Sequence, residues 1–177
     1  MKSERLTLRE FQADDFDAVH SYATDLEVVR YMTWGPNTEE ETRAFLERAE
    51  SHAAADPRTS YELAVMETST DRLIGGIGVD AKDRQGMLGY CFARPAWGQG
   101  FATEAARLIL DFAFKTLEMH RVWAGCDSEN AASVRVLEKV GMRREGCHRR
   151  DSQIRGVWRD KFAFAILSDE WAALEGR

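Results

Sequence analysis

Two glycines near the middle of the chain have the spacing of a loop that binds an anion. Gly98 and Gly100 come directly before a long run with helical periodicity. Glycine lets the backbone adopt a positive φ angle or lie close against a ligand. A helix that begins there directs unpaired N–H groups and the positive end of its dipole at one place. We therefore expect residues 97–103 to bind an anion, and phosphate is the anion that such loops usually bind.

A carboxamide and a hydroxyl form the second group of interest. Asn130 and Ser133 are three positions apart at the start of another helical run, so they lie on one face of that helix near its N-terminus. The same spacing suits purely structural roles, because Asn130 can cap the helix and Ser133 can hydrogen-bond to its first turn. The spacing alone leaves both interpretations open.

Two strand–helix units position these residues. Residues 87–94 predict a strand that ends before Pro95, which has no N–H to donate to a sheet. Apolar residues recur at helical spacing from Ala102 onward. Residues 121–126 predict the next strand, and residues 131–140 predict a helix that ends at Gly141. Because a helix connects the two strands, we expect them to be parallel.

The other segments surround these units. Residues 5–11 predict an opening strand, residues 61–66 and 73–79 a hairpin, and about 143–148 and 156–167 two closing strands. Short helices are expected after Asp14 and around residues 27–31, and a capping box at residues 38–41 begins a longer helix. Trp171 and Leu174 predict a tail helix. No repeat or linker interrupts the pattern, so residues 1–177 predict a single α/β domain.

Composition narrows the class of protein. Of the 177 residues, 44% are apolar and 31% are charged, as in ordinary globular enzymes. No apolar run approaches the roughly 20 residues of a membrane span, and the first residues lack the apolar core of a signal peptide. Three widely spaced cysteines indicate buried thiols of a cytoplasmic protein, and the four histidines show no metal-ligand spacing. The net charge of −6 argues against nucleic-acid binding and favours a cationic partner, such as an amine or a basic protein tail.

Two well-known phosphate-binding loops do not fit residues 97–103. A P-loop ends in Gly-Lys-Ser/Thr, and no lysine follows Gly100. The dinucleotide fingerprint of nicotinamide-dependent enzymes has a glycine where this chain has Thr103, and it opens on the first strand of its domain. A surface turn without a ligand is a further alternative.

The segment does resemble the pyrophosphate-binding loop of the GNAT acetyltransferases, which has the form (Arg/Gln)-x-x-Gly-x-(Gly/Ala). The chain matches this form at Gly100 and Ala102 and departs from it at Trp97. Residues 97–105 and 130–142 together are similar to one branch of the superfamily, the ribosomal-protein N-acetyltransferases RimJ and RimL. Weaker similarities near both ends extend the resemblance over nearly the whole chain.

The resemblance implies a GNAT fold, in which a mixed, twisted central sheet of about seven strands is flanked by helices. Such a sheet is splayed between strands 4 and 5, and coenzyme A enters the splay. Backbone N–H groups at the end of the fourth strand would bind the pantetheine arm and polarise the thioester carbonyl, and the glycine loop would bind the pyrophosphate. The implied cofactor-binding residues are Phe92, Ala93, Arg94, Gln99, Gly100, Phe101, Ala102, Thr103, Asn130 and Ser133.

The resemblance also implies an activity, which is acetyl transfer from acetyl-CoA to a primary amine by direct attack in a ternary complex. A protein N-terminal α-amine is the expected acceptor. A small polycationic amine, such as a polyamine or an aminoglycoside, is an alternative acceptor within the same fold. A module that binds acyl-CoA without turnover is the alternative from another class, and a nicotinamide-dependent enzyme is more remote. A homodimer is common in the family.

Individual residues are candidates for roles in this reaction. Ser133 is the expected catalytic residue, because its hydroxyl can protonate the departing sulfur. The aromatic residues expected near the acceptor are Tyr31, Trp34 and Tyr61, and a core or loop-anchoring role is the alternative for each. The candidate general bases are Glu10, Asp151 and Asp160, of which Asp160 also suits a structural role.

Overall fold

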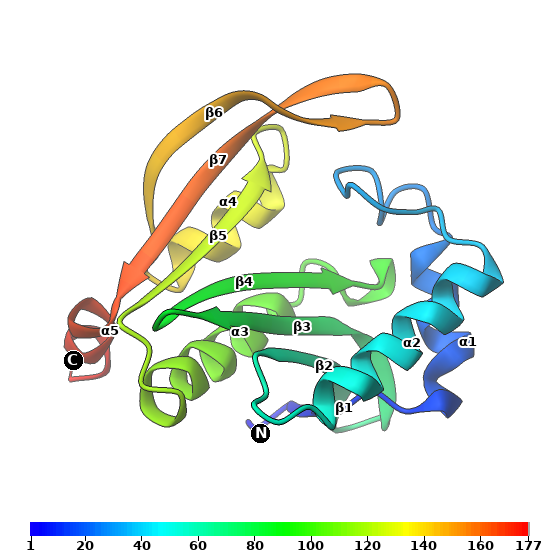
Figure 1. Cartoon of the computed structure of the whole chain (residues 1–177), viewed down its shortest axis with the longest axis horizontal. Helices are drawn as coiled ribbons and strands as arrows, with labels where there is room; N and C mark the ends of the chain where they lie inside the picture. Colours follow the sequence, from blue (N-terminus) through cyan, green and yellow to red (C-terminus); the bar gives the residue numbers. More distant parts are fainter. Residues whose placement is uncertain (177) are drawn as a thin grey trace.

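The computed structural model describes residues 1–176 and has one mixed, seven-stranded sheet at its centre (Figure 1). In spatial order the strands are β1, β2, β3, β4, β5, β7 and β6. Their bounds are β1 Leu6–Glu10, β2 Ser60–Glu67, β3 Arg72–Lys82, β4 Gln85–Phe92, β5 Arg121–Asp127, β6 Arg143–Ile154 and β7 Val157–Leu167. Each strand predicted from the sequence is present, which confirms the α/β fold class.

The sheet opens between β4 and β5. Strands β1 to β4 form an antiparallel meander, whereas β4 and β5 are parallel because α3 (Phe101–Asp111) carries the chain back between them. Residues 85–87 pair with residues 121–123, and beyond these pairs the two strands diverge (Figure 1). This divergence confirms the predicted splay between strands 4 and 5.

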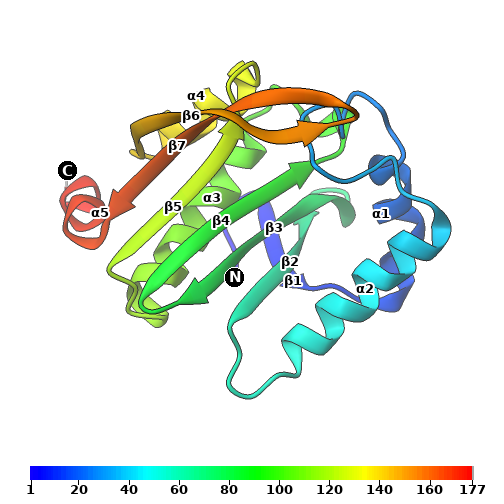
Figure 2. The same cartoon turned by 45° about the horizontal axis from the view of Figure 1, so that its top comes forward.

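Helices cover both faces of the sheet, so the chain has two hydrophobic cores. Helices α3 and α4 (Ala131–Lys139) cover one face, and α1 (Phe16–Ala23) and α2 (Glu39–Ala53) cover the other (Figure 2). Alternation along β2 shows the division, because successive side chains of a strand point to opposite faces. Leu63 and Val65 belong to the larger core with α3, whereas Ala64 belongs to the smaller core with α1 and α2.

The remaining elements are short. Single 3-10 turns occur at Ala13–Asp15 and Arg94–Ala96, a π-helical turn at Phe112–Thr116 extends α3, and α5 (Ser168–Glu175) forms the tail. The predicted capping box is confirmed, because Thr38 accepts a hydrogen bond from the N–H of Glu41 at the start of α2. None of the helices in residues 1–176 is long and apolar enough to cross a membrane.

Residues 24–38 form an irregular loop, which corrects one expectation. The sequence predicts a short helix around residues 27–31, but the structure has turns there. The loop is held from a distance by Arg155, which lies between β6 and β7 and donates hydrogen bonds to three of the loop's carbonyl oxygens. Helix propensity is a weak preference that such tertiary contacts override.

Candidate active site

The glycine loop between β4 and α3 presents backbone N–H groups. Gly98 and Gly100 have positive φ angles of 75° and 83°, and Gly100 is the N-cap of α3. The N–H of Glu104 donates to the carbonyl oxygen of Gly100 at 3.1 Å and so begins the helical hydrogen bonding. The three preceding N–H groups have no acceptor within the helix and point out of its end. Their direction suits a phosphate group.

Side chains from two other segments hold this loop. Arg5, just before β1, donates a hydrogen bond to the carbonyl oxygen of Gln99 (3.0 Å) and forms a salt bridge with Glu104 of α3. The indole N–H of Trp97 donates to the carbonyl oxygen of Phe92 at 2.8 Å. Trp97 is the residue that departs from the general form of the loop, and here it ties the loop to the end of β4.

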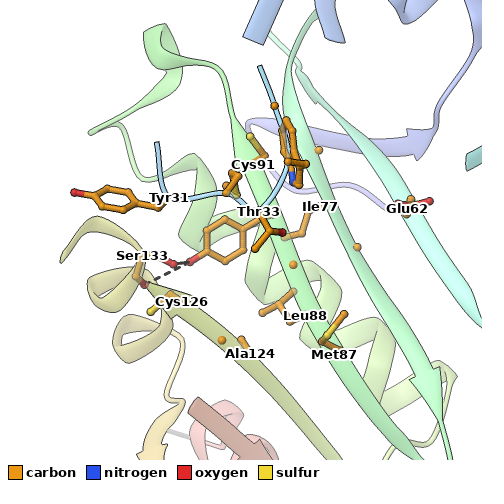
Figure 3. Close-up of a pocket in the computed structure, with 18 of the residues that line it drawn as sticks. Tyr31, Thr33, Glu62, Ile77, Met87, Leu88, Cys91, Ala124, Cys126 and Ser133 are labelled. Carbon is orange, nitrogen blue, oxygen red and sulfur yellow. Dashed lines mark hydrogen bonds between the residues drawn. The ribbon is translucent and has the colours of Figure 1, made fainter. Parts of the chain in front are cut away.

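A cavity of about 860 Å³ lies where β4 and β5 separate (Figure 3). Tyr31 and Trp34 line it from the irregular loop, and Asn130 and Ser133 line it from the start of α4. The structure thus brings four of the predicted site residues around one cavity. Within the described chain, residues 92–103 do not line this cavity but follow β4, one of the strands that form its wall.

Asn130 and Ser133 combine a structural role with a place in the cavity wall. The Oδ1 atom of Asn130 accepts a hydrogen bond from the N–H of Ser133 (3.0 Å), so Asn130 caps α4. The Oγ atom of Ser133 lies 2.8 Å from the Oη atom of Tyr90, and a dashed line marks this hydrogen bond in Figure 3. Tyr90 was missed by the sequence analysis. The sequence did contain a signal for Tyr90, which lies in β4 between Leu88 and Phe92 and on the same buried face of the strand. A tyrosine hydroxyl buried there needs a hydrogen-bond partner.

The end of β4 offers fewer backbone donors than the resemblance implies. The N–H of Ala93 donates to the carbonyl oxygen of Ile74 on β3 at 2.9 Å, so it is not available to a ligand. Alternate residues of a strand direct their N–H groups to opposite sides. Phe92 therefore directs its N–H away from β3 and toward the splay. Among the N–H groups expected to act near the end of β4, the geometry therefore favours Phe92 over Ala93.

Carboxylates line the cavity as well. Among the three predicted candidate bases, Asp160 lines it, whereas Glu10 and Asp151 do not. Glu10 is bound to Arg58 by two hydrogen bonds, of 2.8 and 2.9 Å. Glu62 of β2 was missed, and its side chain faces the cavity (Figure 3). The sequence signal for Glu62 was a charged residue in the middle of a mostly apolar strand.

Tyr61 does not belong to the site. Its ring packs edge-on against Phe112, with 5.1 Å between ring centroids, on the face of the sheet that α3 covers. The adjacent residue, Glu62, lies on the cavity side because successive side chains of a strand alternate between faces. The expectation that Tyr61 lies near the acceptor was therefore wrong.

Burial sets the protonation state of several ionisable groups in the cavity wall. It raises the pKa of the Cys91 thiol to about 12, and it also raises the pKa of the Cys126 thiol. Burial likewise raises the pKa of the Tyr90 phenol, and this effect outweighs the hydrogen bond with Ser133, which lowers it. All three groups therefore stay protonated near neutral pH. The cavity holds thiols but no ready thiolate nucleophile at Cys91 or Cys126, which suits direct attack by an amine.

Comparison with known proteins places this geometry in a family. Residues 5–143 match the family described as "Acetyltransferase (GNAT) domain". The chain is 36% identical to the uncharacterized N-acetyltransferase YnaD of Bacillus subtilis (strain 168). The match extends over 172 residues, which are 96% of this chain and 97% of YnaD. The crystal structure of a GNAT-family acetyltransferase from Bacillus anthracis matches with a TM-score of 0.85 at 33% identity, over 96% of this chain and 98% of that one. The spermidine N(1)-acetyltransferase of Escherichia coli (strain K12) is 24% identical over 168 residues, which cover 94% of this chain and 88% of that protein.

The chain belongs to the GNAT acetyltransferase family. It is an acetyl-CoA-dependent N-acetyltransferase. The residues present fit this co-substrate, because the positive-φ glycines and the N-terminus of α3 suit a pyrophosphate and the splay leaves room for a pantetheine arm.

Proposed function

We propose that this acetyltransferase acts on the α-amine of a protein N-terminus, as the RimJ and RimL branch that it resembles does, by direct attack in a ternary complex. The pairing of two cavity carboxylates, Glu62 and Asp127, carries the proposal, because these two groups are bound to basic side chains of the protein itself. A single amine needs one negative partner, whereas a polyamine needs several. Apolar side chains at the cavity rim favour an acceptor with a peptide body.

The two paired carboxylates line the cavity from different strands. On β2, Glu62 interacts with His52 at 3.2 Å and with Arg48 at 3.9 Å. At the end of β5, Asp127 forms a salt bridge with Arg159 at 2.7 Å. A polycation would have to displace these partners before it could use the carboxylates. The Asp127 side chain is only 2% exposed, and removing the partner of such a buried carboxylate is costly, so Asp127 serves the fold more readily than a second or third ammonium group.

The open side of the site is apolar. Trp34 and Met87 line the cavity and are each 40% exposed. Trp123 is 37% exposed and pairs with Met87 across the short parallel ladder, so the two side chains share a face. Next to them, the missing side chain of Gly89 leaves open space, since a Cβ atom there would have no neighbour within 4 Å. Exposed apolar groups around a hollow mark a binding surface, here for the first side chains of a peptide.

Under this proposal each group has a distinct role in the transfer. When bound, acetyl-CoA supplies an acetyl group that is activated as a thioester. The N-terminus of α3 holds the pyrophosphate, Asn130 hydrogen-bonds to the pantetheine arm, and the N–H of Phe92 stabilises the charge that develops on the carbonyl oxygen. Ser133 protonates the departing sulfur. Because the pKa of such a thiol is near that of cysteine, about 8.5, Ser133→Ala should slow turnover rather than abolish it.

A small polycationic amine, such as a polyamine or an aminoglycoside, is the second candidate acceptor. Acidic residues outnumber basic ones in the cavity lining, which attracts a cation. The similarity to a spermidine acetyltransferase supports the same candidate. The net charge of −6 suits either acceptor.

Steady-state acetylation of matched acceptors tests the proposal. The three acceptors are a short peptide with a free N-terminus, the same peptide with a formylated N-terminus and an internal lysine, and spermidine. We expect kcat/KM to be at least about tenfold higher for the free peptide than for the other two. A preference for spermidine would replace the protein acceptor by a polyamine. Binding of acetyl-CoA without any acetylated product would favour a module that binds acyl-CoA without turnover.

The cellular context is part of the proposal. Cys91, Cys126 and Cys147 are free thiols, as is usual in the reducing cytoplasm, and we place the enzyme there. A homodimer stays a prediction of the family resemblance, and light scattering of the purified protein tests it.

A further inference from the structure

We propose that Tyr90 is a positioning residue for the transfer: its hydroxyl donates a hydrogen bond to Ser133 and thereby aims the seryl proton into the cavity. The inference rests on the role proposed above for Ser133. The sequence pattern assigned no function to Tyr90. The inference is based on the contact between Tyr90 and Ser133, which are 43 positions apart and belong to different strand–helix units.

The hydrogen bond crosses the splay of the sheet. Tyr90 lies on β4 beyond residues 85–87, where the pairing with β5 ends, and Ser133 lies on α4, which follows β5. The Oη atom of Tyr90 is 2.8 Å from the Oγ atom of Ser133 and 3.4 Å from its carbonyl oxygen. Both residues line the cavity, and Figure 3 labels Ser133 there. The phenol therefore reaches Ser133 from the strand whose end carries Phe92, the proposed donor to the thioester carbonyl.

The backbone of Ser133 is fixed by the helix cap, so only the direction of its hydroxyl hydrogen remains to be set. Its backbone N–H is bound to Asn130 at the helix cap, so the main chain is fixed. The Cys126 thiol is a second side-chain hydrogen-bond neighbour of Ser133. When Tyr90 donates to the Oγ atom, the O–H of Ser133 can turn from Cys126 to a sulfur atom in the cavity. A hydroxyl that accepts one hydrogen bond also becomes a better donor in the next, because hydrogen bonds in a chain polarise one another.

Tyr90 is suited to act as a permanent donor. Its ring packs against the larger core, 6.3 Å from the ring of Phe92 between centroids, so the hydroxyl is held in place before the substrates bind. Burial raises the pKa of its phenol, so it keeps its proton over the working pH range. A donor fixed in advance needs no reorganisation during the reaction.

The proton balance of the step is simple. As the carbon–sulfur bond breaks, its electron pair stays on the sulfur, and Ser133 gives its proton to that sulfur. The acceptor nitrogen releases one proton to solvent when the amide forms, and solvent returns one proton to Ser133. Tyr90 keeps its own proton throughout, and this is the difference between a positioning residue and an acid.

A double-mutant cycle tests the inference. Tyr90→Phe removes the hydroxyl and keeps the ring, so the core packing is retained. We expect kcat to fall about five- to tenfold, the range of one neutral hydrogen bond of about 1 kcal/mol, with the KM for acetyl-CoA changed less than about twofold. In the Ser133→Ala background, Tyr90→Phe should have no further effect on kcat, because its target is gone. Tyr61→Phe is the matched control, since Tyr61 is a strand tyrosine outside the cavity, and it should leave kcat unchanged.

The outcomes separate this inference from the proposed function. If Ser133→Ala has the kcat of the unmodified enzyme, the role proposed for Ser133 fails, and the role of Tyr90 fails with it. If Ser133→Ala slows turnover but Tyr90→Phe does not, the inference about Tyr90 alone is overturned. Additive losses in the double variant would also overturn it, because Tyr90 would then act independently of Ser133. Equal unfolding temperatures of the variants would exclude a general loss of structure.

Discussion

The guanidinium of Arg155 donates a hydrogen bond to the backbone carbonyl oxygen of Val29 at 2.6 Å, across 126 positions of sequence. The same side chain donates to the carbonyl oxygens of Arg30 (2.7 Å) and Gly35 (3.1 Å). Arg155 lies in the turn between β6 and β7, and the three carbonyl groups lie in the loop that contributes Tyr31 to the cavity. The hairpin of β6 and β7 thus holds the irregular loop of residues 24–38, which we propose lies next to the acceptor.

Arg155→Ala should therefore weaken acceptor binding. We expect the KM for the acceptor peptide to rise about tenfold, because the loop loses hydrogen bonds from a charged donor, and the KM for acetyl-CoA to stay within about twofold. Steady-state kinetics with each substrate varied in turn measure both values. Arg149→Ala, at an exposed position of β6 in the same hairpin, is the control. An unchanged KM for the peptide in Arg155→Ala would show that the hairpin does not govern the loop.

A second prediction concerns stability and the pair formed by Arg159 and Asp127. The Asp127 side chain is only 2% exposed, and Arg159 binds it with two hydrogen bonds, of 2.7 and 2.9 Å. Arg159→Ala leaves this buried carboxylate without its basic partner, with the N–H of Glu129 still donating to it, so we expect the free energy of unfolding to fall by about 3–5 kcal/mol. Urea denaturation measures the change. The matched control is Arg143→Ala, because Arg143 is 76% exposed in its salt bridge with Glu170, and such a pair contributes about 0–1 kcal/mol. Similar losses in both variants would contradict the assignment.

A third prediction follows from the thiols. Because burial raises the pKa of Cys91 to about 12, only about one molecule in 10⁴ carries the Cys91 thiolate at pH 8. The thiolate is the reactive form, so iodoacetamide at pH 8 should label the exposed Cys147 first and leave Cys91 unmodified. The rate at Cys91 should rise about tenfold per pH unit as pH increases toward that pKa. Peptide mass spectrometry locates the label.

A second mass-spectrometric experiment on the thiols tests the mechanism. Direct attack by the amine leaves no role for an acetylated cysteine. Protein incubated with acetyl-CoA and no acceptor should therefore show no stable acetyl adduct on Cys91 or Cys126 in its intact mass. An acetylated Cys91 that transfers its acetyl group when the peptide is added would replace direct attack by a two-step route.

Local patterns were sufficient to predict much of the fold. The strand before Pro95, the glycine loop and the capping box at Thr38 depend on residues close together in sequence, and the structure has all three. The parallel arrangement of β4 and β5 followed from the helix between them. Placing Asn130 and Ser133 at the start of a helix needed only their spacing.

The remaining features depend on contacts that the sequence pattern does not contain. The expected helix around residues 27–31 is replaced by turns, and Arg155, far along the chain, binds the carbonyl groups of Val29 and Arg30 there. Tyr61 was expected near the cavity but lies on the other face of the sheet. Alternation along a strand shows which residues share a face, but not which face borders the cavity. Tyr90 was missed because its partner, Ser133, belongs to another strand–helix unit.

The central claim is that the N-terminus of α3 binds the pyrophosphate of acetyl-CoA, and a matched pair of variants at its N-cap tests it. Gly100 has a φ angle of 83°, and Asn and Asp are the side chains that best tolerate this region. Gly100→Asn and Gly100→Asp have nearly the same shape and differ by one negative charge. Gly100→Asp adds a negative charge at the N-terminus of α3, next to the place where the pyrophosphate should bind, and a Cβ atom there would lie 3.6 Å from an Nη atom of Arg5.

The measurement is the shift in unfolding temperature with acetyl-CoA, CoA or NAD. A ligand at one hundred times its dissociation constant adds about 2.7 kcal/mol, which is about 5–10 °C for a domain of this size. We predict that both CoA compounds, and not NAD, stabilise the unmodified protein and Gly100→Asn, and that Gly100→Asp loses most of the shift. Equal stabilisation of both variants by CoA, or stabilisation by NAD instead, would contradict the assignment of this loop.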